Sequence, residues 1–110
     1  MDEHEAREAI KVFQALGDPH RLAIVEQLIR APRSVQELAD KLPISRPAVS
    51  RHLRVLKANH FVLDEARGTR RIYRVRPESV EALCNYLERL WDEAQRRFVI
   101  AAENTRAKRQ

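Results

Sequence analysis

The segment LPISRPAVSRHLRVLK, residues 42–57, decides the fold of this chain. Pro43 cannot continue a preceding helix, and Ser45 suits the start of a new one because its hydroxyl accepts a hydrogen bond from a free backbone N–H. We expect this new helix to run from about residue 46 to residue 58. Its apolar side chains recur at helical spacing and predict one buried face, made by Val49, Leu53 and Leu56.

The exposed side of the same helix is basic and rich in hydrogen-bond donors. Successive residues of a helix are turned by about 100°, which places a set of polar and cationic side chains outside the core. These residues are Arg46, Pro47, Ser50, Arg51, Arg54 and Lys57. Such a surface is typical of proteins that bind nucleic acids.

Three further helices are predicted before this segment. Residues 5–16 and 19–30 carry apolar side chains at steps of three and four, as amphipathic helices do. Ser34 and Glu37 are spaced as a capping box, which starts a short third helix that ends before Pro43. Two short helices joined by a tight turn, the second one basic outside, describe a helix-turn-helix.

After His60 the pattern changes to a period of two. Residues 61–63 and 71–76 predict two β-strands, and the turn between them contains Gly68. The fold class is therefore mainly α with a small β-hairpin, a winged helix-turn-helix. The polar residues at or beside the hairpin tip are Arg67, Thr69, Arg70 and Arg71.

A last helix is expected to open at Pro77, and its apolar residues alternate steps of four and three as in a heptad seam. A helix of about 20 residues is about 30 Å long, more than a small domain can cover, so a second copy of the chain is the simplest partner. We expect residues 1–103 to form one DNA-binding and dimerisation domain and residues 104–110 to form a disordered tail. The expected dimer interface comprises Ile10, Phe13, Val80, Leu83, Cys84, Leu87, Trp91, Ala94 and Phe98.

The distribution of charge supports a polyanionic partner. The 110 residues hold 21 Lys and Arg against 16 Asp and Glu, a net charge of +5. Residues 41–76 hold ten basic residues against only Asp64 and Glu65, a net charge of +8, while the remainder carries −3. We expect double-stranded DNA as the partner. The alternatives are a solvated basic face and a protein-binding winged helix that grips an acidic partner.

Other classes of protein fit the sequence poorly. A single cysteine excludes a disulfide framework, and no apolar run exceeds five residues, so we expect a cytoplasmic protein without membrane contact. The four histidines match no metal spacing, and the chain has neither a glycine-rich phosphate loop nor a nucleophile elbow. We expect no catalytic site and no cofactor.

Together with ALGDPHRL at residues 15–22, the segment 42–57 resembles the ArsR family of bacterial winged-helix repressors over about residues 5–101. The resemblance implies a homodimer whose terminal helices pack together and whose recognition helices enter successive major grooves. It also implies repression that is relieved by an effector or a change of conditions. Many members sense metals through a Cys-x-Cys pair before the recognition helix, or through Asp, His and Glu on the last helix. Residues 36–40 contain no cysteine and no histidine follows His60, so we expect no metal site; the effector stays unknown.

Within this framework each candidate residue has an expected role. Bidentate Arg to guanine is the commonest specific major-groove contact, so the expected base readers are Arg46, Ser50, Arg51 and Arg54. Ser45 is first a helix cap, in a position that also suits a phosphate. The wing residues are expected at the DNA backbone or in the minor groove.

Two residues keep alternative interpretations. His52 either packs at the edge of the DNA contact or senses pH. Cys84 is either a small buried hydrophobe on the dimer seam or one half of a redox-sensitive bridge across the dyad, which would make the protein a thiol-responsive repressor.

Overall fold

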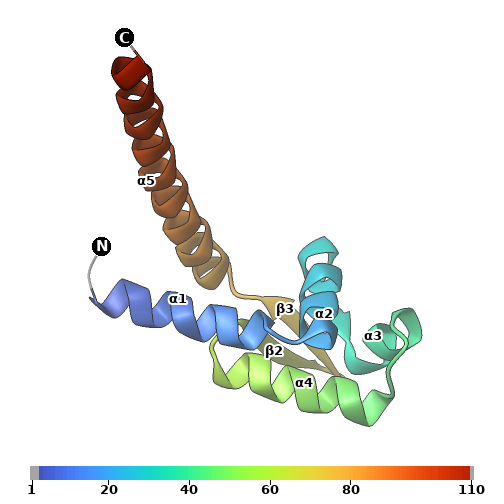
Figure 1. Cartoon of the computed structure of the whole chain (residues 1–110). Helices are drawn as coiled ribbons and strands as arrows, with labels where there is room; N and C mark the ends of the chain where they lie inside the picture. The colour runs from blue at the N-terminus through green and yellow to red at the C-terminus, as the bar shows by residue number, and fades with distance from the viewer. Residues whose placement is uncertain (1–2, 110) are drawn as a thin grey trace.

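The computed structural model of this protein describes residues 3–109. It confirms the winged helix-turn-helix, with a mainly helical chain and one small antiparallel sheet (Figure 1). The elements in chain order are α1 (Glu3–Leu16), α2 (Pro19–Arg30), β1 (Arg33–Ser34), α3 (Val35–Lys41), α4 (Arg46–Ala58), β2 (Val62–Arg67), β3 (Arg70–Val75) and α5 (Pro77–Arg109).

Local capping sets the helix starts. Asp18 accepts hydrogen bonds from the backbone N–H groups of His20 and Arg21 at the start of α2, at 2.8 and 3.2 Å. Ser34 and Glu37 form the expected capping box on α3, in which each side chain accepts from the other residue's backbone N–H. The cap residues therefore satisfy backbone donors that no helical partner reaches.

One hydrophobic core joins α1, α2, α3 and α4 to the sheet. Its side chains come from one face of each helix and from the start of the wing, where Phe61 and Val62 are nearly inaccessible. In α2 the buried face differs from the predicted stripe, because Ile24 is buried whereas Leu22 and Ile29 are exposed. The three predicted core residues of α4 are fully buried and fix which side of that helix faces outwards. The largest buried side chains of this core are Ile24, Leu38, Val49, Leu53, Leu56, Phe61 and Val62.

The sheet has one strand more than the sequence predicts. In the order β1-β3-β2, the two-residue strand β1 pairs antiparallel with β3, with Arg33 opposite Tyr73 and Ser34 opposite Ile72. Two residues are too few to show an alternating pattern, so the sequence could not predict strand β1. The pairing ties the wing to the start of the helix-turn-helix.

The last helix differs from expectation at its end. α5 continues to Arg109, so residues 104–109 are helical where a disordered tail was predicted. Residues 101–109 contain neither glycine nor proline and are rich in Ala, Glu, Lys and Arg, which are good helix formers. Figure 1 shows the greater part of α5 standing clear of the other elements.

Candidate nucleic-acid interface

Helix α4 presents its cations to solvent. Ser45 caps the helix by accepting a hydrogen bond from the Ala48 backbone N–H at 3.3 Å, as predicted. Arg46, Arg51 and Arg54 are exposed, and within residues 3–109 no hydrogen bond or ion pair holds any of the three side chains. Their guanidinium groups are therefore free to bind a partner.

The wing arginines differ because each one is paired within the chain. Arg67 lies 2.9 Å from a carboxylate oxygen of Glu65. Arg70 reaches back to α3, where it lies 2.7 Å from a carboxylate oxygen of Glu37 and donates to the Ser34 hydroxyl at 2.9 Å. These side chains stay more than half exposed, so they can still contact a phosphate. To do so, each must loosen or share its ion pair with a carboxylate of this chain.

Asp64, on strand β2 of the wing, contacts both α4, the recognition helix, and strand β3. Its Oδ1 is 2.8 Å from Nζ of Lys57 in α4, and its Oδ2 is 2.7 Å from a guanidinium nitrogen of Arg71 in β3. The Asp64 side chain is only 7% exposed. The hydrogen bond from Lys57 is the largest cause of a lowered pKa of Asp64; burial opposes the shift, and Arg71 adds to the lowering. The carboxylate is therefore a charged bridge between α4 and β3.

His52 is partly buried on α4, at its contact with the start of α2. Its ring lies 5.7 Å from the ring of His20, centroid to centroid. Burial is the main cause of a lowered pKa of His52, against which the nearby Asp18 carboxylate acts. The structure thus gives His52 a packing role at this junction.

The predicted dimer face is largely uncovered in the single chain. Phe13 and Trp91 are 43% and 65% exposed, and Phe98 is 75% exposed. Val80 and Leu83 instead pack against the domain's own core, while Cys84 is exposed. The remaining predicted interface residues with exposed side chains are Ile10, Leu87 and Ala94.

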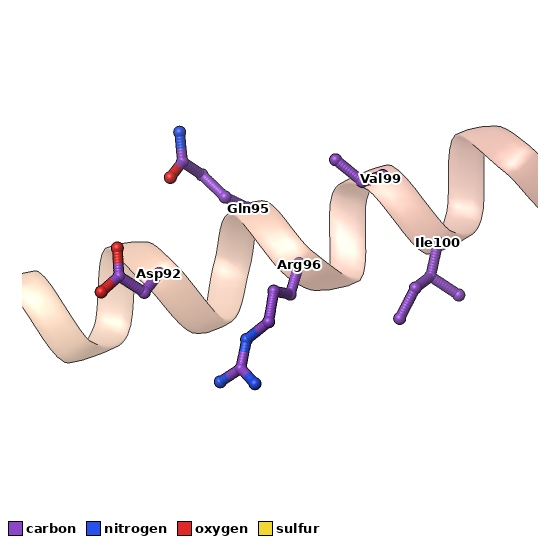
Figure 2. A pocket seen from close by; sticks show the side chains of 5 residues that line it. All are labelled: Asp92, Gln95, Arg96, Val99 and Ile100. Carbon is purple, nitrogen blue, oxygen red and sulfur yellow. The ribbon is translucent and has the colours of Figure 1, made fainter.

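Helix α1 covers only the first part of α5. Phe13 contacts Tyr86 edge-on with ring centroids 5.9 Å apart, and Glu5 lies 2.9 Å from Arg89. Beyond that contact an open groove follows α5 (Figure 2). Its lining consists of Asp92, Gln95, Arg96, Val99 and Ile100. Because all these side chains belong to one helix, the groove is the surface of a bare helix and encloses no ligand site.

Several residues of this surface were missed by sequence reasoning. Glu37, Asp64 and His20 each contact a predicted DNA-facing residue from another element. For Asp64 a signal existed, because it is one of only two acids in the basic window of residues 41–76. The sequence identified Glu37 only as a helix cap. Nothing in the local pattern of residues 15–22 predicts that His20 contacts α4.

Comparison with known proteins agrees with this geometry. Residues 16–64 match the family model described as "Helix-turn-helix domain". The HTH-type transcriptional regulator Rv2034 of Mycobacterium tuberculosis is 50% identical over 84 residues, which are 76% of this chain and 78% of that protein.

Solved structures show the same fold. An ArsR-like transcriptional regulator from Rhodococcus sp. RHA1 superposes with a TM-score of 0.74 at 35% identity, over 86% of this chain and 89% of that one. The homodimeric winged helix-turn-helix DNA-binding domain of Mb0332 from Mycobacterium bovis, a possible ArsR-family transcriptional regulator, gives 0.66 at 26% identity, over 86% and 91%.

A capped basic helix set on a helix-turn-helix core and flanked by a wing defines a DNA-binding transcriptional regulator and not an enzyme. The chain belongs to the ArsR family of winged helix-turn-helix transcriptional regulators. In the part of the chain that the structure describes, no helix is both long and apolar enough to cross a membrane. Nor do residues 3–109 bring together three or more His, Cys, Asp or Glu side chains that could hold a metal ion.

Proposed function

We propose that this protein is a homodimeric repressor that binds a pseudo-palindromic DNA operator and does so without sensing a metal. The observation that carries the proposal is the state of α4, where Arg46, Arg51 and Arg54 are exposed and unpaired within the described residues. Bidentate contacts from such arginines to guanine supply base discrimination, whereas phosphate contacts supply affinity alone.

The uncovered face of α1 and α5 supports the dimer. Trp91 and Phe98 are large apolar side chains that stay exposed to water in the single chain. Packing against the same face of a second copy removes this apolar surface from water in both chains. A two-fold axis then duplicates the recognition helix. Helix-turn-helix dimers of this kind bind half-sites about one turn of DNA, roughly 34 Å, apart.

Independence from metals rests on the residue types present. Thiolates, imidazoles and carboxylates in groups of three or four are the usual ligands of regulatory zinc and of similar transition-metal ions. The chain has one cysteine and no histidine after His60. Bound at an operator, such a dimer represses by occupying the DNA, and its release depends on a signal other than these metals.

Selection of bound duplexes from a random pool tests the operator. We expect a recovered motif with two-fold symmetry and an affinity that falls steeply with salt, because the basic surface displaces counterions. Binding that is equal on random and selected duplexes would contradict sequence-specific repression. A gel shift without any salt-sensitive DNA complex would instead favour the alternative, a module that binds an acidic protein.

A further inference from the structure

We propose that Asp64 is a specificity-determining residue of the DNA-binding surface, because it holds the wing against the recognition helix and engages two cations that would otherwise bind any phosphate. This inference rests on the proposed function and adds a role for an acid within a surface that binds a polyanion.

The geometry of the bridge carries the first step. One carboxylate oxygen of Asp64 lies 2.8 Å from Nζ of Lys57, and the other lies 2.7 Å from a guanidinium nitrogen of Arg71. Lys57 lies in the last turn of α4, and Arg71 lies at the start of β3 next to the hairpin tip. Beyond the core contacts of Phe61 and Val62, a single side chain on β2 thereby links the polar part of the wing to the helix that reads bases.

Burial distinguishes this carboxylate from an ordinary surface ion pair. The Asp64 side chain is 7% exposed, whereas its partners Lys57 and Arg71 are 54% and 55% exposed. Surface ion pairs contribute little, but a buried carboxylate needs its partners to stay charged and bound. Asp64 therefore holds one N–H group of each cation, while the remaining N–H groups of Lys57 and Arg71 face solvent.

Glu65, the next residue, provides a contrast within the same wing. Its side chain is 43% exposed, and its partners Arg67 and Arg74 both belong to the hairpin itself, at 2.9 and 3.8 Å. Glu65 carries the same charge in the same basic window, yet it does not link the wing to α4. Any effect that comes from charge alone must appear at both positions.

Specific and non-specific binding respond differently to these two acids. Attraction to phosphates depends on net charge and is insensitive to the exact orientation of the wing. Base readout by α4 requires that helix and wing contact the duplex together in one register. Loss of Asp64 therefore increases the attraction to every duplex but removes the orientation that favours the correct one.

The experiment compares Asp64→Asn with the matched control Glu65→Gln, each of which removes one negative charge. Affinities for the selected operator and for a random duplex are measured at several salt concentrations. For Glu65→Gln we expect both affinities to rise by the same factor, so that their ratio is unchanged. For Asp64→Asn we expect the random duplex to gain more, and the ratio of operator to random affinity to fall roughly fivefold.

Asp64→Glu keeps a carboxylate at this position and should restore most of the ratio. The comparison of Asp64→Asn with Glu65→Gln is what separates the bridge from net charge, because both variants lose one negative charge. If Asp64→Asn does not fold, as judged by circular dichroism, Lys57→Gln opens the other side of the bridge and should also lower the ratio. Loss of a simple phosphate contact at Lys57 would weaken both duplexes equally. Equal ratios in Asp64→Asn and Glu65→Gln would overturn the proposal, whereas a wild-type protein that prefers no duplex would overturn the proposed function itself.

Discussion

The imidazole rings of His20 and His52 lie 5.7 Å apart, centroid to centroid, and connect the first turn of α2 to the middle of the recognition helix. Asp18, which caps α2, is the negative group nearby, and Arg21 and Arg51 add positive charge. Burial is the first cause of the lowered pKa of His52, and the neighbouring cations act in the same direction. Burial of His52 therefore favours its neutral form in the folded protein.

The first prediction concerns the pH dependence of stability. Because the pKa of His52 is lower in the folded protein than in the unfolded chain, the unfolded chain binds more protons, and stability falls as the pH drops below about 6.5 towards the folded pKa. His52→Gln should flatten the change in Tm between about pH 7.5 and pH 5.5. Thermal melts followed by circular dichroism measure this, with His4→Gln as the control because His4 is exposed near the start of α1. An unchanged slope in His52→Gln would contradict the assignment.

The second prediction separates base readers from backbone contacts. Arg46→Ala or Arg51→Ala should cost about 1 to 3 kcal/mol on the selected operator and relax preference at particular base pairs, provided that the contact is bidentate. Arg67→Ala should weaken all duplexes alike and lower the slope of log affinity against log salt by about one. Repeating the duplex selection with each variant checks the difference. Identical sequence profiles for the two classes would refute the division of roles.

The third prediction places the dimer interface. Trp91→Glu should give a folded monomer, because Trp91 is 65% exposed in the single chain and lies outside its buried core. Operator affinity should fall by more than in any single arginine variant, since half of the DNA contacts are lost together. Analytical ultracentrifugation measures the assembly. Ile29→Glu on α2, where Ile29 is 64% exposed, is the matched control and should remain dimeric; a dimeric Trp91→Glu protein with normal affinity would show that the interface lies elsewhere.

The fourth prediction tests the absence of metal sensing. Zinc, cadmium, copper or arsenite should leave operator affinity unchanged, and a chelator should also have no effect, because the usual ligand sets are missing from the sequence. Gel shifts with each ion give the readout, and calorimetry of the free protein gives the stoichiometry. Tight stoichiometric binding coupled to release of DNA would be the contrary result.

Much of this surface follows from local sequence. The apolar spacing of Val49, Leu53 and Leu56 defines the buried side of α4, so the opposite side and its arginines are known without a fold. The Ser34 and Glu37 pair starts α3 because a capping box needs only residues three apart. Helix starts, the hairpin and the basic face thus depend on neighbours in the chain, and the sequence contains them.

The pairing of charges was decided by tertiary structure. Arg70 and Glu37 are 33 residues apart in the chain, and they meet because β1 pairs with β3 beside the start of α3. In the same way, Asp64 reaches Lys57 only because β2 lies against α4, and His20 reaches His52 only because α2 packs on that helix. Periodicity shows which side of an element is buried but not which element covers it. The sequence by itself therefore determined that α4 presents cations on its exposed side, whereas only the packing of the wing decided which cations are free and which are already held by an acid.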